Sequence, residues 1–194
     1  MPTTHLLYLH GFRSSPQSAK AQLMAERVAR HHPNVHWWCP QLPPSPRAAM
    51  ALVAQEIAHW PHHQMAVVGS SLGGFYASWV AQHTGCPAVL LNPAVNPARD
   101  LARYIGEQTH WHNEAERFYF DPDFIGELHA LDVRNAPFLG RQMAIVAQGD
   151  EVLDWREMVA RYPQAKLSLL EGGDHALSNF PVHIDAVVQF LQLA

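Results

Sequence analysis

Residues 65–74, MAVVGSSLGG, form the stretch that decides the fold of this chain. It runs from a short apolar segment, typical of a buried strand, through a G-x-S-x-G sequence into a segment with helical period. A serine at such a sharp turn needs small residues two positions before and after it, because the backbone is strained and closely packed. Gly69 and Gly73 give this room to Ser71. The preceding serine, Ser70, has no such pair. The stretch therefore predicts a strand, a tight turn and a helix, with the Ser71 hydroxyl exposed at the carboxyl edge of a sheet.

Short apolar runs alternate with longer stretches of helical period along most of the chain. This alternation is typical of βα units, in which helices join parallel strands and cover the sheet. We therefore expect an α/β fold with a mostly parallel sheet of about six strands and helices on both faces. The expected strands are residues 5–9, 35–39, 65–68, 88–91, 143–147 and 166–170.

Capping residues and prolines predict where the helices begin and end. Ser15 is expected to cap the first helix, with Pro16 at its first position and its end near His31. A rigid connector with Pro43, Pro44 and Pro46 should lead into a second helix that carries residues 49–57. Further helices are expected over residues 72–83, 154–161 and 181–193.

Residues 95–140 break this alternation, because they are rich in aromatic, histidine and charged residues of mixed helical character. Chains divide into separate cores only beyond about 250 residues, so we expect residues 1–194 to form a single domain. Within it, residues 95–140 are interpreted as a small helical, cap-like insert. The alternative is that they complete the helical layer. The aromatic residues of the segment are expected to lie over the sheet edge that bears Ser71, unless they form the core of the insert. They are Trp111, Phe118, Tyr119, Phe120 and Phe124.

Composition excludes several kinds of partner. The formal net charge is −4 and the 13 lysines and arginines are scattered, so no basic stripe is available for nucleic acid. The sequence has no apolar leader and no run of about 18 apolar residues, and we expect a cytoplasmic protein without a membrane span. Cys39 and Cys86 lack C-x-x-C spacing, and His110 and His112 lack further ligands at convincing spacing. We therefore expect neither a disulfide framework nor a metal site.

A serine hydroxyl becomes a nucleophile when a histidine takes its proton and a carboxylate fixes the histidine tautomer. Two later strands end in segments that supply these groups. Asp150 follows the strand expected at 143–147, and His175 follows the strand expected at 166–170. Parallel strands end at the same edge of a sheet, so Ser71, Asp150 and His175 should meet there. Three other carboxylates near these strand ends are weaker candidates for the acid: Glu151, Asp154 and Asp174.

The segment after the first strand, His10-Gly11-Phe12, is placed to stabilise negative charge on a reacting oxygen. The backbone N–H groups of Phe12 and of Leu72, the residue after the candidate nucleophile, should form an oxyanion hole. Gly11 lets the backbone approach closely. The alternative is that His10 and Gly11 only begin a turn.

These motifs belong to segments that together resemble one known family, the YqiA-type small bacterial esterases of the α/β-hydrolase superfamily. The matching segments are LLYLHGFRSSPQSAKA, PQLPPSP, VVGSSLGGFYASWVAQ, LNPAVNP, QGDEVLDWREMVARY and EGGDHALSNF. The resemblance implies the α/β-hydrolase fold, hydrolysis of a small-molecule carboxylic ester or thioester, and no metal or organic cofactor. It also supports Ser71, Asp150 and His175 as the catalytic residues. The segment THWHNEAERFYFDPDF departs from the pattern, so the choice of substrate stays open.

Other functions remain alternatives at this point. An acyl-CoA or other acyl thioesterase would use the same three residues. Arg13 could then contact an anionic group, but an exposed arginine at a helix start is the favoured interpretation. A non-catalytic binding protein could keep the fold without the chemistry. A dehalogenase is disfavoured, because it would need a carboxylate in place of Ser71. The sequence leaves the oligomeric state open.

Overall fold

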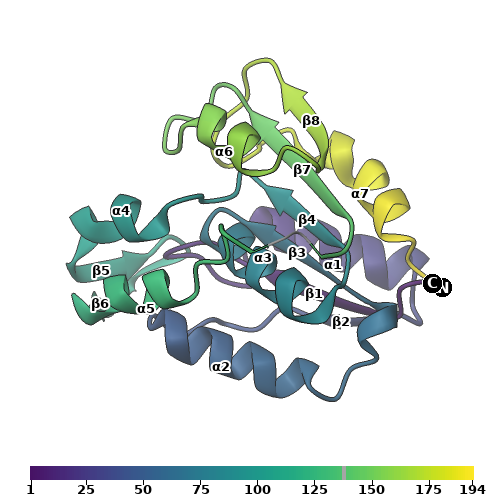
Figure 1. Cartoon of the computed structure of the whole chain (residues 1–194), viewed down its shortest axis with the longest axis horizontal. Helices are drawn as coiled ribbons and strands as arrows, with labels where there is room; N and C mark the ends of the chain where they lie inside the picture. Colours follow the sequence, from purple (N-terminus) through teal and green to yellow (C-terminus); the bar gives the residue numbers. More distant parts are fainter. Residues whose placement is uncertain (137–138) are drawn as a thin grey trace.

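The computed structural model describes residues 1–136 and 139–194, and a parallel sheet lies at their centre (Figure 1). Its strand order is β2-β1-β3-β4-β7-β8, and every neighbouring pair is parallel. The strands are β1 (His5–Leu9), β2 (His36–Trp38), β3 (Met65–Ser70), β4 (Ala88–Leu91), β7 (Gln142–Ala147) and β8 (Lys166–Leu170). The six strands expected from the sequence are confirmed to within two residues at each end.

Helices cover both faces of this sheet, as expected. One face carries α1 (Ala19–His31) and α7 (Ile184–Leu191), and the other carries α2 (Pro46–Ile57), α3 (Leu72–Thr84) and α6 (Trp155–Arg161). Successive side chains of a strand point to opposite faces, so β1 contributes Leu7 and Leu9 to one core and Leu6 and Tyr8 to the other. Burial on both faces explains why these strands are almost continuously apolar in sequence.

Helix α1 begins later than predicted. Ser15 was expected to cap it, but Ser18 is the residue before the first helical residue. The Ser15 hydroxyl instead accepts a hydrogen bond from the N–H of Gln17, and its carbonyl accepts one from the N–H of Ser18. These bonds close a turn ahead of the helix, so the prediction of Ser15 as a helix cap is wrong.

Two other helix boundaries also differ from expectation. Pro46 is the first residue of α2 and not part of the connector, because the Ser45 hydroxyl caps the helix by accepting a hydrogen bond from the N–H of Ala48. At the C-terminal end, residues expected to begin a helix at Pro181 form a 3-10 turn, η3 (Phe180–His183), which leads into α7.

The segment expected as a helical insert also contains a β-hairpin. It comprises α4 (Pro97–Leu101), η2 (Ala102–Tyr104), β5 (Gly106–His110), β6 (Asn113–Phe120) and α5 (Asp123–Ala130). The antiparallel pair β5–β6 stands apart from the main sheet, between α4 and α5 in Figure 1. The sequence pattern did not predict this hairpin. The last part of the expected segment includes residues 137–138, which lie outside the described residues.

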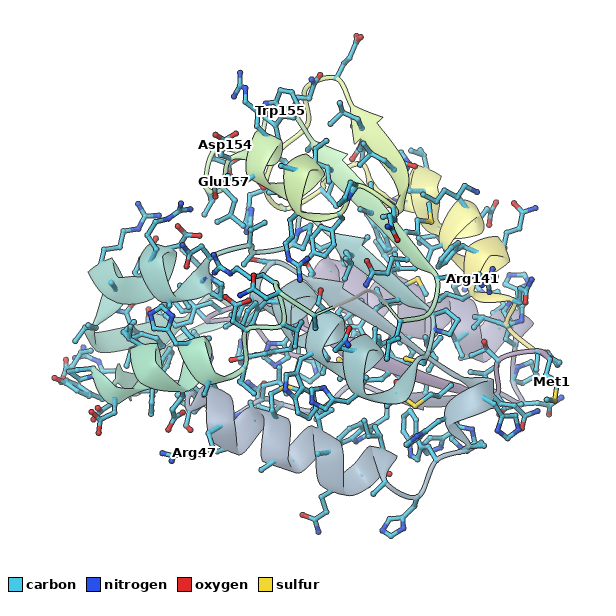
Figure 2. The ribbon with its side chains drawn as sticks, viewed as in Figure 1. Met1, Arg47, Arg141, Asp154, Trp155 and Glu157 are labelled. Carbon is cyan, nitrogen blue, oxygen red and sulfur yellow. The ribbon has the colours of Figure 1, made fainter. Side chains whose placement is uncertain are left out.

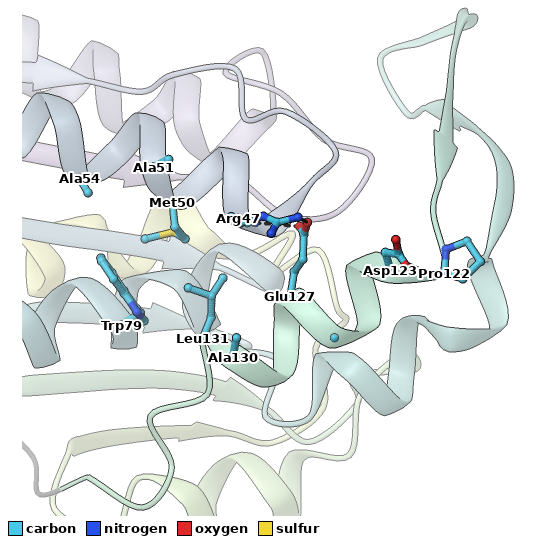
Figure 3. A pocket seen from close by; sticks show the side chains of 11 residues that line it. Arg47, Met50, Ala51, Ala54, Trp79, Pro122, Asp123, Glu127, Ala130 and Leu131 are labelled. Atoms are coloured by element: carbon cyan, nitrogen blue, oxygen red, sulfur yellow. Dashed lines mark hydrogen bonds and ion pairs between the residues drawn. The ribbon is translucent and has the colours of Figure 1, made fainter.

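Two ion pairs connect the insert to helices of the main domain. Arg47 at the start of α2 forms an ion pair with Glu127 of α5 at 2.6 Å, beside an open cavity of about 690 Å³ between α2, α3 and α5 (Figure 3). Arg99 of α4 forms a bidentate pair with Glu157 near the start of α6, where Figure 2 shows Glu157. The residues that line the cavity between α2, α3 and α5 do not include Ser71, Asp150 or His175.

The two chain ends lie side by side (Figure 1). The N–H of Thr3 donates to the carbonyl of Gln192, and the N–H of Ala194 donates to the carbonyl of Thr3. Because β1 begins at His5, this junction lies at the amino edge of the sheet, opposite the edge where Ser71 follows β3. Among the helices described, none is long and apolar enough to cross a membrane.

Candidate active site

Ser71 lies at the turn between β3 and α3 in a backbone conformation that non-glycine residues rarely adopt. Its φ is 55° and its ψ is −120°. Tight packing around the turn explains the flanking glycines. A Cβ atom on Gly69 would lie 2.1 Å from the carbonyl oxygen of Gly73, and one on Gly73 would lie 1.9 Å from that of Leu9. Only glycine fits at either position, as the G-x-S-x-G pattern predicted.

The Ser71 hydroxyl faces the imidazole of His175. The distance between Ser71 Oγ and His175 Nε2 is 3.0 Å, and His175 Nδ1 lies 2.8 Å from Asp150 Oδ2. The Asp150 side chain is fully buried, whereas the His175 side chain keeps 20 % of its surface exposed. The structure thus brings together the three residues that the sequence singled out, although they are up to 104 positions apart.

Backbone groups hold the Asp150 carboxylate in place. Its Oδ1 accepts hydrogen bonds from the N–H groups of Val152 and Leu153, both at 2.8 Å. An ionised carboxylate only accepts hydrogen bonds, so the shared proton belongs on Nδ1 of His175. The lone pair of Nε2 is then directed to the Ser71 hydroxyl, which is the arrangement that a general base requires.

The other acidic candidates have different partners. Asp154 caps α6 by accepting a hydrogen bond from the N–H of Arg156, and Figure 2 shows it at the start of that helix. Asp174 accepts hydrogen bonds from the hydroxyl and the N–H of Ser178, which lower the pKa of its carboxyl group. Glu151 accepts a hydrogen bond from the backbone N–H of His175 at 3.0 Å. None of the three contacts the His175 ring.

The loop after β1 packs directly against the candidate nucleophile. A Cβ atom on Gly11 would lie 3.2 Å from Ser71 Cβ and 3.7 Å from Ser71 Oγ. Within the described residues, the N–H groups of Phe12 and Leu72 donate no hydrogen bond. Leu72 is the first residue of α3, where a backbone N–H has no partner within the helix. Two unpaired donors are therefore available beside Ser71, where the oxyanion hole was predicted.

The His10 ring connects this loop to the segment that contains Leu42 through two hydrogen bonds. Its side chain is buried; Nδ1 lies 3.0 Å from the carbonyl of Gly11, and Nε2 accepts a hydrogen bond from the N–H of Leu42. Nδ1 therefore carries the proton of a neutral ring. Burial lowers the pKa of His10 to about 4, so the ring stays neutral at physiological pH.

Asn92 is a functional position that sequence reasoning missed. It is 1 % exposed and follows β4 with a φ of 41°. Its Nδ2 donates to the carbonyl oxygens of Asp174 and His175 at 3.0 and 3.2 Å, and its Oδ1 accepts from the N–H of Ala147. The side chain thus fixes the loop that carries His175. The available signal was its position directly after a central strand, at the same sheet edge as Ser71.

Arg13 is half-buried before the start of α1 and lines a cavity beside Ser71, and part of its guanidinium binds the β5–β6 hairpin. Its Nη2 donates to the hydroxyl of Thr109 at 2.8 Å, and its guanidinium lies 4.1 Å from the ring centre of Trp111. The N–H of Trp111 donates to the Arg13 carbonyl. These contacts join the loop after β1 to the tip of the β5–β6 hairpin.

Only one of the five aromatics expected over the site lines the cavities beside Ser71. This residue is Trp111, which is 70 % exposed. Phe118 and Phe120 pack edge-on against Phe12, and Phe124 packs against Phe120. Tyr119 is exposed on the hairpin. These three aromatics therefore neither line the cavities nor form a separate core for the insert; they extend the core on one face of the sheet into the insert.

Two cavities meet at Ser71 and His175. We call the first, of about 200 Å³, the apolar cavity; its own lining combines Leu72, Ala94, Pro97, Leu101, Tyr104 and Leu153 with the charged residues Arg13, Asp100 and Arg103. We call the second, of about 360 Å³, the polar cavity; its own lining includes His10, Ser14, Ser18, Lys20 and Glu151. Phe12, Trp111 and Val152 line both. No cluster of three or more histidine, cysteine, aspartate or glutamate side chains suited to a metal ion occurs in residues 1–136 and 139–194.

A parallel sheet with a serine at the turn after β3, an acid after β7 and a histidine after β8 defines the α/β-hydrolase class. The chain belongs to the Uncharacterised protein family (UPF0227), whose model matches residues 5–192. This membership confirms the resemblance drawn from the sequence motifs.

Solved structures of the same class resemble the chain over nearly its whole length. Est1E from Butyrivibrio proteoclasticus, with ferulic acid bound, has a TM-score of 0.74 at 13 % identity, with 98 % of this chain and 87 % of that chain covered. The esterase domain of a Rhodothermus marinus protein has a TM-score of 0.73 at 14 % identity, with 99 % of this chain and 88 % of that chain covered. Alpha/beta hydrolase domain-containing protein 10 from mouse has a TM-score of 0.70 at 15 % identity, with 98 % of this chain and 92 % of that chain covered. These similarities establish the fold.

Proposed function

We propose that this protein is a serine esterase that hydrolyses carboxylic esters through an acyl-enzyme intermediate on Ser71. The observation that carries the proposal is the hydrogen-bonded chain from Ser71 Oγ through the His175 ring to the buried Asp150 carboxylate. A serine hydroxyl without this arrangement is a weak nucleophile at neutral pH. The Est1E and Rhodothermus marinus structures agree with an esterase, since their descriptions name that activity.

In the proposed reaction, Ser71 Oγ attacks the ester carbonyl while His175 Nε2 takes the hydroxyl proton. The N–H groups of Phe12 and Leu72 stabilise the negative charge that develops on the carbonyl oxygen. His175 then gives its proton to the departing alkoxide, which leaves as an alcohol. A water molecule, deprotonated by His175, attacks the acyl-enzyme and releases the acid and free Ser71. These steps involve no metal ion or organic cofactor.

The apolar cavity is the proposed site for the acyl chain. A volume of about 200 Å³ is below the usual range for drug-sized ligands, so it suits a short to medium chain. Residues 95–140 act in this proposal as a cap, because Trp111 on the hairpin walls both cavities. The thioesterase alternative uses the same chemistry and differs in its leaving group and in the acyl length that it prefers.

Labelling with a fluorophosphonate, followed by peptide mapping, tests the proposal. Modification of Ser71 that disappears in His175→Ala is the expected result, because the label reacts only with an activated serine. A protein that binds esters without hydrolysing them would stay unlabelled. That outcome would overturn the esterase proposal in favour of the binding-protein alternative.

A further inference from the structure

The polar cavity contains a lysine that the proposed chemistry does not use. Lys20, in the first turn of α1, lines this cavity together with Ser71 and His175. It is one of only two lysines in the chain; the other, Lys166, lies at the start of the edge strand β8. Lysine is rarely placed in a cleft without a partner, because removal of its charge from water is unfavourable.

The Lys20 ammonium keeps spare hydrogen-bonding capacity. Its Nζ donates one hydrogen bond, to the carbonyl of Ala176. An ammonium group has three donors, so two remain. Among residues 1–136 and 139–194, no carboxylate lies within ion-pair distance of Nζ. Burial lowers the pKa of Lys20 to about 8, while Asp174 and Asp150 act in the opposite direction. The side chain therefore remains mostly charged at neutral pH.

The acidic side chains around Lys20 have other partners. Asp150 binds His175 and two backbone N–H groups, and Asp174 binds Ser178. Glu151 lines the same cavity, but it is exposed and accepts a hydrogen bond from the N–H of His175. The lining charges are thus a half-buried cation without a direct counterion and a solvated carboxylate that already accepts a hydrogen bond.

Two hydroxyl groups add to the donors in this cavity. The side chains of Ser14 and Ser18 line it, and neither hydroxyl has a hydrogen-bond partner within the described part of the chain. Ser18 precedes α1 without capping it. Lys20 and these two hydroxyls supply an ammonium and two neutral donors on one side of Ser71, which is a donor set suited to an anionic oxygen group.

We propose that the polar cavity binds an anionic oxygen group, a carboxylate or a phosphate, on the alcohol part of the ester, with Lys20 as its charged ligand. The inference rests on the proposed esterase function, since it assigns the alcohol part to the cavity that the acyl chain does not occupy. It gives the enzyme a charge preference that the three catalytic residues cannot provide.

Matched pairs of esters test this preference. One pair is 3-carboxyphenyl butyrate and the uncharged 3-carbamoylphenyl butyrate, and the other is 2-phosphoethyl butyrate and 2-hydroxyethyl butyrate. We expect kcat/KM to favour the anionic member by about tenfold in the native enzyme, because a hydrogen bond to a charged group contributes that much. The pair with the larger ratio identifies the anion as a carboxylate or a phosphate.

Substitutions test which residues cause the preference, expressed as the ratio of kcat/KM for the anionic ester to kcat/KM for its uncharged partner. In Lys20→Met the ratio should fall to about one, and in the double variant Ser14→Ala/Ser18→Ala it should fall partly. Lys166→Met removes the same charge from the edge strand and is the matched control, so it should keep the native ratio. Thermal unfolding of each variant verifies that it is folded.

Three outcomes would overturn the inference. Equal kcat/KM for both members of each pair in the native enzyme would show that the cavity does not recognise charge, while the esterase function stands. A loss in Lys20→Met that is the same for charged and uncharged esters would mean that Lys20 only positions the His175 loop through Ala176. Hydrolysis of no ester at all would overturn the esterase function itself, and the inference with it.

Discussion

The backbone conformation of Ser71 is set by its neighbours, so its side chain can be changed without disturbing the turn. Ser71→Ala should keep the fold and lower the turnover of p-nitrophenyl butyrate by about four or more orders of magnitude. Ser70→Ala, at a buried position that lacks a contact with His175, should have a mild effect. Steady-state kinetics and circular dichroism measure both. Comparable losses from the two variants would mean that the turn has been misinterpreted.

Asp150 and Asp154 provide a second comparison between neighbouring residues. Asp150→Asn should lower turnover by about 10⁴-fold, because an amide at this position favours the wrong tautomer of His175. Asp154→Asn should retain most activity, since asparagine also caps helices well. Steady-state turnover of the two variants shows which aspartate acts with His175. If Asp154→Asn were the damaging change, the assignment of the acid would fail.

His10 predicts how stability depends on pH. Its pKa is about 4 in the folded protein, below its ordinary value of 6.5, so between these values the unfolded chain binds a proton that the folded protein does not. Stability contributed by neutral His10 is therefore present above pH 6.5 and is lost as the pH falls toward 4. Near pH 5 the free energy of unfolding should be about 2 kcal/mol lower than near pH 7 from this residue alone.

Urea unfolding at the two pH values measures this effect, with His10→Gln as the comparison. The variant should lose less stability than the native protein on acidification. An equal loss in both would show that His10 does not carry the pH dependence.

At the residue scale, the sequence predicted the side chains that fit a known catalytic pattern and missed Asn92, which also follows a strand but binds only backbone groups. Ser71, Asp150 and His175 were found because parallel strands bring their carboxyl ends to one edge. Asn92 was missed because its partners are carbonyl and N–H groups as far as 83 positions away, which no side-chain pattern reveals.

At the element scale, the strands of the central sheet were predictable and the hairpin was not. Strands buried on both faces are marked by runs of apolar residues. Strand β6 is exposed over most of its length, so its sequence, NEAERFYF, has little apolar alternation. The start of α1 was predicted at the wrong serine. A serine that closes a turn and a serine that caps a helix both accept a hydrogen bond from a nearby backbone N–H, so the local sequence does not distinguish them.

The hairpin also offers a test of the proposed cap. Trp111→Ala should raise KM for aryl esters several-fold and leave the melting temperature nearly unchanged, because the side chain is 70 % exposed yet lines both cavities. Tyr119→Ala is the matched control, since Tyr119 is exposed on the same hairpin and lines neither cavity. Equal effects of the two variants on KM would argue against a wall formed by Trp111.

For the whole molecule, the proposed placement of the acyl chain in the apolar cavity predicts a limit to the length of that chain. Each methylene buried contributes about 0.8 kcal/mol, so kcat/KM should rise over the first few carbons and then level or fall once the cavity is full. A series of p-nitrophenyl esters and acyl-CoA thioesters from two to sixteen carbons measures the profile. Activity that rises steadily to sixteen carbons would favour the long-chain thioesterase.

The junction of the chain ends has a practical consequence. Thr3 and Gln192 meet at the amino edge of the sheet, while Ser71 and both cavities lie at the carboxyl edge. A tether at either terminus would therefore fix the protein to a solid support by the same side, with the cleft directed into the medium. The two ends are also close enough for both to be anchored at a single point.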